Sequence, residues 1–338
     1  MFIEEEALSY PIGESIRRRL TGLRVPVTVL RKGQRPEVPG KNPSQVYAEA
    51  KKTLVVRVRK EKEFSSCRPS AHYQLPLVTS CPGLCQYCYL QTQLGPRPYI
   101  RAYANLEEIL STAQRLAAAR SPEVTVFEGA ATSDPLPIEH ITGSLRRSIE
   151  HFGAAENSRF RFVTKFADVE PILGAGHGGN TAVRFSVNAS HVLRSYEYGT
   201  ASLEQRLEAL GKVKSDGYPV GLMIGPVITF EGWKDEYRSL LDQVRTVLEG
   251  AVPGSDKSAG ELTFEIITHR FTSRAKKNIL SVFPNTTLPM EEGERRLVHG
   301  QFGYTKYLYP KETMDEVRHF FEEEIPRRVP GATIAYTV

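Results

Sequence analysis

The sequence predicts an α/β protein whose core is a partial (β/α)6 barrel. From Tyr73 onward, short apolar runs alternate with longer amphipathic stretches, which indicates parallel strands joined by helical crossovers. Six such units follow one another, which is too few for a closed eight-fold barrel. The chain of 338 residues is long enough to bury a sizeable core.

Residues 1–60 are expected to form an N-terminal segment that packs on the barrel. Within this segment we predict a helix over 14–22 and strands over 25–30 and 53–59. A basic stretch interrupted by Gly and Pro, 31–43, lies between the two strands and is expected to be a linker.

Residues 61–285 are expected to form the barrel itself. The six strands are predicted at 73–79, 124–127, 159–164, 182–187, 220–224 and 262–267. The helices are predicted at 106–120, 138–152, 168–173, 203–215 and 233–248, and a glycine-rich turn at 174–179.

Residues 286–338 differ from this pattern. An aromatic segment that contains two glycines, 297–309, predicts a β-hairpin. A helix over 312–324 and a closing strand over 332–337 are expected to follow it.

Three of the four cysteines, Cys81, Cys85 and Cys88, lie in one loop with the spacing C-x3-C-x2-C. Thiolates this close can hold one [4Fe–4S] cluster, and three protein ligands leave one iron open for an exchangeable ligand. A structural zinc site normally uses four ligands in two pairs, and a disulfide framework needs an even number of cysteines in an oxidising compartment. The iron–sulfur interpretation is therefore favoured over zinc.

The cysteine spacing resembles the signature of the radical S-adenosylmethionine (SAM) superfamily, and the aromatic Tyr87 between the second and third cysteines also fits it. Further segments resemble the spore photoproduct lyases, with a similarity that runs from about Tyr10 to the C-terminus. These segments are CPGLCQYCYLQT (81–92), PYIR (98–101), TSD (132–134), FVTKF (162–166) and RFSVN (184–188).

The resemblance implies a barrel of the radical SAM type that binds SAM and a [4Fe–4S] cluster. It also implies repair of the spore photoproduct, which is a 5-thyminyl-5,6-dihydrothymine lesion. In that family a 5′-deoxyadenosyl radical abstracts hydrogen from C6 of the lesion, the methylene bridge breaks, and SAM is regenerated at the end.

By resemblance, Ser133, Lys165, Ser186 and Asn188 belong to the SAM pocket. They lie at or just after the ends of predicted barrel strands, where the chemistry of such barrels gathers. A lysine there can bind the SAM carboxylate as a point charge. The alternative interpretation is that these residues are ordinary turn caps and a solvated lysine.

The sequence departs from the family pattern at Ala131. In the better-known lyases a cysteine just before the Thr-Ser-Asp run donates a hydrogen atom to the product thymine radical, and alanine cannot do so. We hypothesise that Cys67, the one cysteine outside the triad, replaces this donor. Two alternatives stay open: Cys67 is a surface thiol without a role, or Ala131 is an engineered change. Tyr89, and with it Tyr87, is a candidate for the radical relay, with packing beside the cluster as the alternative.

Basic and aromatic residues in and before the predicted hairpin are candidate DNA contacts: Arg270, Arg295, Arg296, Lys306 and Tyr304. Basic side chains neutralise phosphates, and aromatic side chains can fill the gap left by an extruded base. A pair of linked thymines cannot enter a barrel while it is stacked in the duplex, so base flipping is required. The alternative is a solvated charged face with an ordinary hairpin core.

The net charge of +5 and the pI near 8.9 permit binding to DNA without requiring it. We expect a cytoplasmic monomer that does not contact a membrane, because neither an export signal nor a spanning segment is visible. Its expected partners are double-stranded DNA carrying a thymine-dimer lesion and an electron donor such as flavodoxin or ferredoxin. Two rival functions stay open: a related radical SAM enzyme for a different nucleic-acid lesion, and a non-catalytic DNA-binding protein with a structural metal.

Overall fold

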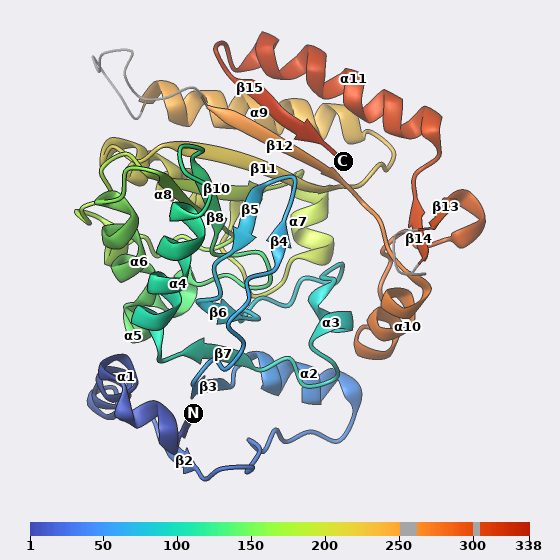
Figure 1. Ribbon diagram of the computed structural model, residues 1–338. Coiled ribbons are helices and arrows are strands. Elements are labelled where there is room, and N and C mark those ends of the chain that lie inside the picture. Colours follow the sequence, from blue (N-terminus) through green and yellow to red (C-terminus); the bar gives the residue numbers. More distant parts are fainter. Residues whose placement is uncertain (251–261, 300–304) are drawn as a thin grey trace. The chain divides into compact units, whose positions relative to one another are not determined.

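The structure is a computed structural model (Figure 1), and it describes residues 1–250, 262–299 and 305–338. The chain divides into two units. The first contains Met1–Pro82 and Arg97–Val183, and the second contains Gly83–Pro96 and Arg184–Val338. The three-part division expected from the sequence stays a prediction.

One sheet carries the barrel strands, in the order β15-β12-β11-β10-β9-β8-β5-β4. The pairs β5–β8, β8–β9, β11–β12 and β12–β15 are parallel, whereas β4 is antiparallel to β5. Five of the six strands predicted for the barrel are confirmed as β8 to β12, and β5 takes the place of the first. The bounds are β4 Ser66–Cys67, β5 Ala71–Gln74, β8 Thr125–Glu128, β9 Ser158–Thr164, β10 Thr181–Val187, β11 Val220–Val227, β12 Thr263–Thr268 and β15 Thr333–Thr337.

An aromatic core holds the barrel strands of the first unit to helix α6 (Ser144–Gly153). The ring of Phe152 packs against Phe127 and Phe160, with centroids 5.4 and 5.2 Å apart. All three side chains are buried, and each contributes roughly 1.5–3 kcal/mol of hydrophobic stabilisation. Helix α4 (Leu106–Ala118) also packs on this part of the sheet.

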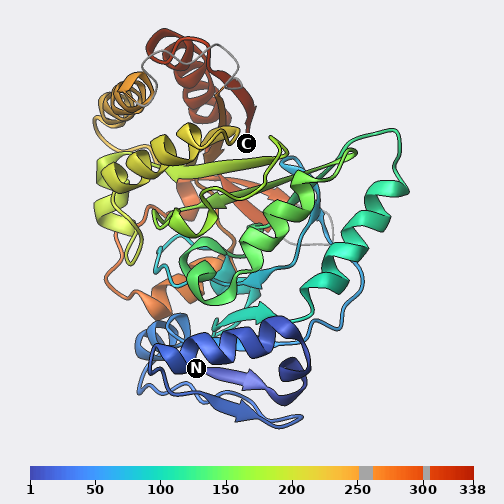
Figure 2. The ribbon, with the colours of Figure 1, turned by 90° about the vertical axis from the view of Figure 1, so that its left-hand side faces the viewer.

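Three strands of the N-terminal segment join β6 and β7 in a second sheet, with the strand order β2-β1-β3-β7-β6. Figure 2 shows helix α1 running alongside β1 and β2. The bounds are β1 Phe2–Glu4, η1 Glu5–Ser9, α1 Pro11–Gly22, β2 Thr28–Leu30, α2 Pro43–Lys51, β3 Leu54–Arg57, β6 Val78–Thr79 and β7 Ile100–Tyr103.

The single strand predicted over 73–79 is wrong. Strand β5 ends at Gln74, and the following residues from Val78 belong to β6 in the other sheet. The backbone N–H of Leu75 still donates to the carbonyl of Glu128 at 2.9 Å. The next residue is Pro76, which has no N–H to continue the ladder, so the chain leaves the sheet there.

The single helix predicted over 138–152 is also wrong. It consists of a 3-10 turn, Leu136–Ile138, and two helices, α5 (Glu139–Thr142) and α6. Gly143 separates the helices with φ of +67°, a left-handed conformation that glycine adopts without a Cβ penalty.

Two further segments differ from their predictions. Residues 168–173 form only a 3-10 turn, Glu170–Ile172. Helix α2 begins inside the expected linker, because the Asn42 side chain accepts a hydrogen bond from the Gln45 N–H at 2.9 Å and Pro43 occupies the first turn. Both are helix N-terminal signals.

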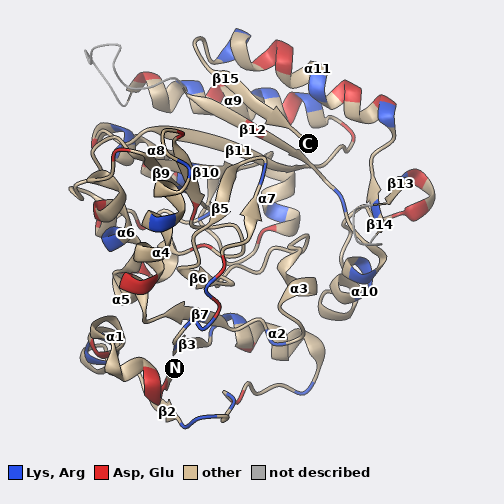
Figure 3. Ribbon diagram, in the orientation of Figure 1, with Lys and Arg blue, Asp and Glu red and all other residues tan. Residues whose placement is uncertain are grey.

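In the second unit, helices α9 (Trp233–Gly250) and α11 (Lys311–Arg328) pack against each other. The rings of Trp233 and Phe320 lie 4.9 Å apart. Figure 3 shows charges of both signs along the two helices, and the ion pairs that join them are Lys234–Glu316, Arg238–Glu324 and Arg328–Asp242. The charges of these helices therefore pair with one another rather than form a single-sign surface.

The predicted hairpin is confirmed by β13 (Arg296–His299) and β14 (Thr305–Leu308), which pair antiparallel. Helix α8 (Leu203–Ser215) also matches its prediction. The sequence patterns did not predict α3 (Leu90–Gln93), α7 (Ser190–Tyr196) or α10 (Ser273–Val282). No helix in the described parts of the chain is long and apolar enough to cross a membrane.

Candidate active site

In the first unit, a buried carboxylate joins the Thr-Ser-Asp segment to the end of strand β9. The Asp134 side chain accepts hydrogen bonds from the Thr164 hydroxyl and the Lys165 N–H, both at 2.9 Å, and from the Leu136 N–H at 3.2 Å. The predicted SAM contacts Ser133 and Lys165 therefore lie on two segments that Asp134 ties together. Both are partly exposed.

Burial raises the pKa of Asp134 to about 6, although its three hydrogen bonds and Lys165 oppose this shift. A raised pKa means that the folded state holds the proton more tightly than the unfolded state, so the stability falls as the pH rises.

We expect the free energy of unfolding of the cluster-free protein, relative to Asp134→Asn, to fall by about 2 kcal/mol between pH 4 and pH 7. Urea unfolding of both proteins across this range measures the difference. Parallel pH profiles of the two proteins would contradict the prediction.

Ser80 joins the start of the cysteine loop to the same segment. It is a buried non-glycine residue with φ of +66°, a conformation that its contacts must stabilise. Its N–H donates to the Thr132 carbonyl at 2.9 Å, and its hydroxyl donates to the Pro98 carbonyl at 2.7 Å. The backbone just before Cys81 therefore lies beside the Thr-Ser-Asp run, which contains Ser133.

The rest of the cysteine loop belongs to the second unit. The N–H groups of Leu84 and Gln86 donate to the carbonyls of Tyr198 and Tyr196 at 2.7 and 2.8 Å. Cys85 in this loop is buried, and Cys88 is half-buried. The loop is therefore anchored by its backbone, which leaves its thiols for other contacts.

A buried ionic network links this loop to the end of strand β10. The Tyr87 hydroxyl donates to Glu197, whose other oxygen accepts from Arg206 at 2.7 Å. Arg206 also donates to the Ser186 carbonyl at 2.9 Å. Burial, together with Glu197 and Cys85, holds the pKa of Tyr87 well above its usual range, so its phenol keeps its proton.

Asn188 is fully buried and its side chain is engaged within the protein. Its amide donates to the Pro226 carbonyl at 2.8 Å, and its oxygen accepts from the Tyr237 hydroxyl at 2.7 Å. These contacts support a role in shaping the strand end that carries Ser186. The four predicted SAM residues are divided between the units, two in each.

Cys67 lies on the edge strand β4, where it pairs with Ala71 of β5. The Ser70 hydroxyl donates to the Cys67 carbonyl at 2.8 Å and lies 3.5 Å from its Sγ. The Ser70 carbonyl accepts from Arg161 at 3.3 Å, and Arg161 donates to Glu128 at 2.7 Å.

This chain of contacts ends at the segment that contains Ala131, because Glu128 accepts a hydrogen bond from the Ala130 N–H at 3.0 Å. Cys67 and Ala131 are therefore connected through a buried ion pair, Arg161–Glu128. They do not share one position, since Cys67 is level with the start of β5 and Ala131 follows the end of β8.

Of the predicted DNA contacts, Arg295 is largely engaged within the protein. It donates to the carbonyls of His269 and Pro289 at 3.1 and 2.9 Å, and its guanidinium lies 3.8 Å from the Tyr309 ring centroid. Burial and the Arg295 charge lower the pKa of His269 to about 3, so this histidine is neutral.

The other predicted DNA contacts differ in exposure. Arg270 and Arg296 are exposed, and Lys306 is half-buried on β14. Tyr304 lies outside the described residues. Next to the hairpin, the rings of Phe271 and Tyr307 stack 5.2 Å apart, so these aromatics form a hairpin core.

The four cysteines are thiols, and none is half of a disulfide. Cys81 belongs to the first unit, and Cys85 and Cys88 belong to the second. In the described parts of the chain, no three His, Cys, Asp or Glu side chains are gathered as a metal site. The residues nevertheless fit a [4Fe–4S] cluster, because three thiols lie within eight residues of the sequence. One of them, Cys81, lies 3.8 Å from the buried ammonium group of Lys51.

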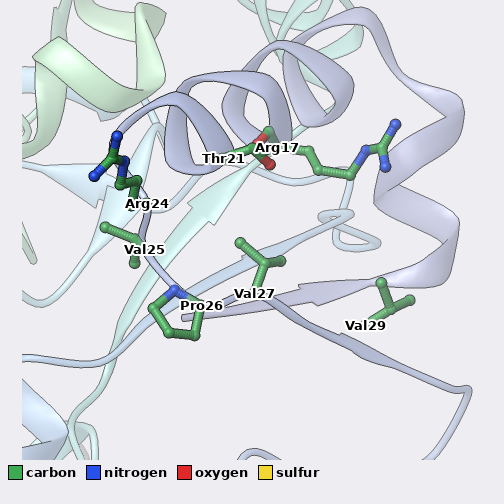
Figure 4. Close-up of a pocket in the computed structure, with 7 residues that line it drawn as sticks. All are labelled: Arg17, Thr21, Arg24, Val25, Pro26, Val27 and Val29. Carbon is green, nitrogen blue, oxygen red and sulfur yellow. The ribbon is translucent and has the colours of Figure 1, made fainter.

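A surface hollow of about 390 Å³ lies between α1 and the segment that leads into β2. Figure 4 shows its lining, which is Arg17, Thr21, Arg24, Val25, Pro26, Val27 and Val29. None of the predicted site residues lines it, so it is separate from the chemistry inferred here.

The functional groups that sequence reasoning missed are Lys51, Glu197 and Arg206. Asn42 and Pro43 signalled the helix that carries Lys51, but nothing local indicated that the lysine is buried. Glu197 and Arg206 are nine residues apart, the first just after α7 and the second in α8, and no local pattern indicated that they would form an ion pair.

Comparison with known proteins identifies the family of this chain. The family model for spore photoproduct lyase matches residues 1–338. The spore photoproduct lyase of Clostridium acetobutylicum is 45% identical over 338 residues, which cover 100% of this chain and 98% of the relative. That of Bacillus subtilis is 42% identical over 337 residues, which cover 99% and 97%.

Solved structures give the same result. A spore photoproduct lyase complexed with dinucleoside spore photoproduct matches with a TM-score of 0.94 at 41% identity, covering 100% of this chain and 98% of that one. A variant in which one cysteine is changed to alanine and one serine to cysteine, with bound AdoMet and dinucleoside spore photoproduct, matches with a TM-score of 0.94 at 42% identity and the same coverage.

The parallel strands and these matches define an enzyme of the radical SAM class on a partial (β/α)6 barrel, which confirms the predicted fold class. The resemblance seen in the sequence is confirmed as well. The chain belongs to the spore photoproduct lyase family, and it is a DNA-repair lyase.

Proposed function

We propose that this enzyme reverses the spore photoproduct in double-stranded DNA to two thymines. The observation that carries the proposal is the full-length match to a lyase structure that holds both AdoMet and the dinucleoside lesion. Retention of the cysteine triad and of the Thr-Ser-Asp run supports it. We further propose that the enzyme is a cytoplasmic monomer reduced by a donor of the flavodoxin or ferredoxin class.

Cys81, Cys85 and Cys88 would hold the [4Fe–4S] cluster, and Ser133, Lys165, Ser186 and Asn188 would form the SAM pocket. When bound, these cofactors supply a 5′-deoxyadenosyl radical that takes a hydrogen atom from C6 of the lesion.

Lys165 is suited to bind the SAM carboxylate, since its backbone is held by buried Asp134. The network of Tyr87, Glu197 and Arg206 would keep the cysteine loop in register with the strand end at Ser186.

Cys67 would supply the hydrogen atom that quenches the product thymine radical. In this step the S–H bond breaks and a C–H bond forms on the thymine methylene carbon, which leaves a thiyl radical on Cys67. The solved double variant supports this role, since its substituted serine and cysteine are 64 residues apart, as Cys67 and Ala131 are here. This chain thus carries a cysteine and an alanine at the same spacing as the pair in that variant.

Tyr89 would return a hydrogen atom to the thiyl radical, so that its phenolic O–H bond breaks and the Cys67 S–H bond forms again. The tyrosyl radical left behind would take a hydrogen atom from the methyl group of 5′-deoxyadenosine, as the resemblance to the family implies. A solved relative carries a tyrosine-to-phenylalanine change 42 residues before the cysteine position, and Tyr89 precedes Ala131 by the same number. The Tyr89 side chain is 52% exposed, so its hydroxyl is accessible to a reaction partner.

Lesion recognition would use the C-terminal region, 286–338. Exposed Arg270 and Arg296, with Lys306, would contact phosphates, while Arg295 would fix the base of the hairpin. The hairpin would stabilise the duplex from which the linked thymines are extruded.

The function is tested by anaerobic incubation with SAM, a reductant and a spore-photoproduct dinucleotide, with release of thymine as the readout. Cys67→Ala is expected to lower the thymine yield by roughly 10²-fold, the scale seen when a positioned proton-transfer group is lost, while SAM cleavage continues. Unquenched radical should then appear as lesion-derived adducts.

The matched control is the double variant Cys67→Ala/Ala131→Cys, which moves the thiol to the family position. It should recover much of the yield if Cys67 acts as the hydrogen donor. An unchanged yield without adducts in Cys67→Ala would contradict the donor role. SAM cleavage without thymine release by the unmodified enzyme would favour a different lesion.

A further inference from the structure

Lys51 is a lysine in an unusual position. It is the last residue of helix α2, and it is only 1% exposed. The next residue, Lys52, shows the ordinary behaviour, since its side chain is 70% exposed and pairs with Glu49. A buried ammonium group costs several kcal/mol unless an anion compensates it.

The contacts of Lys51 show where its charge is directed. Its Nζ lies 3.4 Å from the Ser80 hydroxyl oxygen, 3.8 Å from the Cys81 Sγ and 5.7 Å from the Tyr47 ring centroid. The Ser80 hydroxyl donates its proton to the Pro98 carbonyl, so its oxygen presents a lone pair to Lys51. Ser80 thereby holds the ammonium group in place beside the cysteine.

Within the described residues, Lys51 has no carboxylate partner. The oxygen and ring contacts above are neutral, whereas the Cys81 thiol becomes an anion when it binds a metal. A thiolate that binds iron would therefore supply the compensating negative charge.

We propose that Lys51 acts as a positioning residue that holds a desolvated positive charge against the Cys81 ligand and so raises the reduction potential of the cluster. The inference rests on the proposed function, because it requires the cluster to be bound. An electron added to the cluster increases its negative charge, and a nearby cation in a low-dielectric site stabilises that reduced state. The electron comes from the external reductant, and Lys51 itself is neither oxidised nor reduced.

The test is a potentiometric titration of the reconstituted cluster without SAM, followed by electron paramagnetic resonance and visible absorption. Lys51→Met keeps the length of the side chain and removes its charge. At the midpoint potential of the unmodified protein, we expect the ratio of reduced to oxidised cluster in Lys51→Met to be about tenfold lower than in the unmodified protein. This is equivalent to a potential lower by about 59 mV for one electron. The midpoint potential of Lys51→Arg should stay near that of the unmodified protein. Lys52→Met, which changes the exposed neighbour, should leave the midpoint potential unchanged.

A Lys51→Met protein with full iron content and an unchanged potential would overturn the inference. If that variant fails to fold, Lys51→Gln, which can still bond to Ser80, is measured in its place under the same criterion. Failure of both neutral variants while Lys51→Arg folds would assign the lysine to fold stability and reject the inference. Absence of a cluster in the unmodified protein would instead refute the proposed function.

Discussion

Replacing Cys85 with alanine is expected to abolish assembly of the [4Fe–4S] cluster and, with it, all reductive cleavage of SAM. The same result is expected for Cys81→Ala and Cys88→Ala, because a cubane held by three thiolates does not survive the loss of one. Cys85 is buried in a loop whose backbone is anchored to Tyr196 and Tyr198, so the loss should affect the cluster more than the fold.

The measurement is iron and sulfide content after anaerobic reconstitution, with the visible spectrum of the product. Cys67→Ala is the matched control, since it removes a thiol outside the triad and should retain a full cluster. Full iron in Cys85→Ala, or loss of iron in Cys67→Ala, would contradict the assignment of ligands. A stoichiometric zinc ion in place of iron would support the structural-metal alternative.

Replacing Arg206 with leucine is expected to lower the free energy of unfolding by about 3–5 kcal/mol. Arg206 and Glu197 are both fully buried, with 2.7 Å between Nη2 and Oε2. Removing the arginine leaves an uncompensated carboxylate in the interior. It also removes the donor to the Ser186 carbonyl, so the proposed SAM pocket should lose its shape.

Urea unfolding of the cluster-free protein measures this effect. Arg245→Leu serves as a control, since Arg245 and Glu249 form an exposed pair, and exposed ion pairs contribute little to stability. The double variant Arg206→Leu/Glu197→Leu should be more stable than Arg206→Leu alone, because it removes the orphaned charge. A loss for Arg206→Leu no larger than that of the control would contradict the role of the network.

The barrel strands could be predicted because their signal is local. Short runs of buried β-branched and aromatic residues at β8 to β12 alternate with helical stretches, and this alternation favours parallel strands. The errors came from single residues with strong backbone effects. Pro76 ended a strand that the apolar pattern extended, and Gly143 divided a helix that the pattern joined.

The candidate site divides in the same way. The cysteine spacing and the residues that follow the strands can be found from neighbouring letters, and family membership follows from them. Neighbouring letters do not show whether a polar side chain faces a ligand or the protein interior. Asn188 and Arg295 match functional patterns, yet the structure shows their side chains engaged with Pro226 and His269.

By itself, the sequence determined the class of enzyme, the cysteine triad and the departure at Ala131, because each depends on residue identity and short spacing. Only the tertiary structure decided that Lys51 meets Cys81 and that a buried ion pair connects Cys67 to the Ala131 segment. The physical reason is that burial and ion pairing depend on residues tens of positions apart, which the folded backbone brings together.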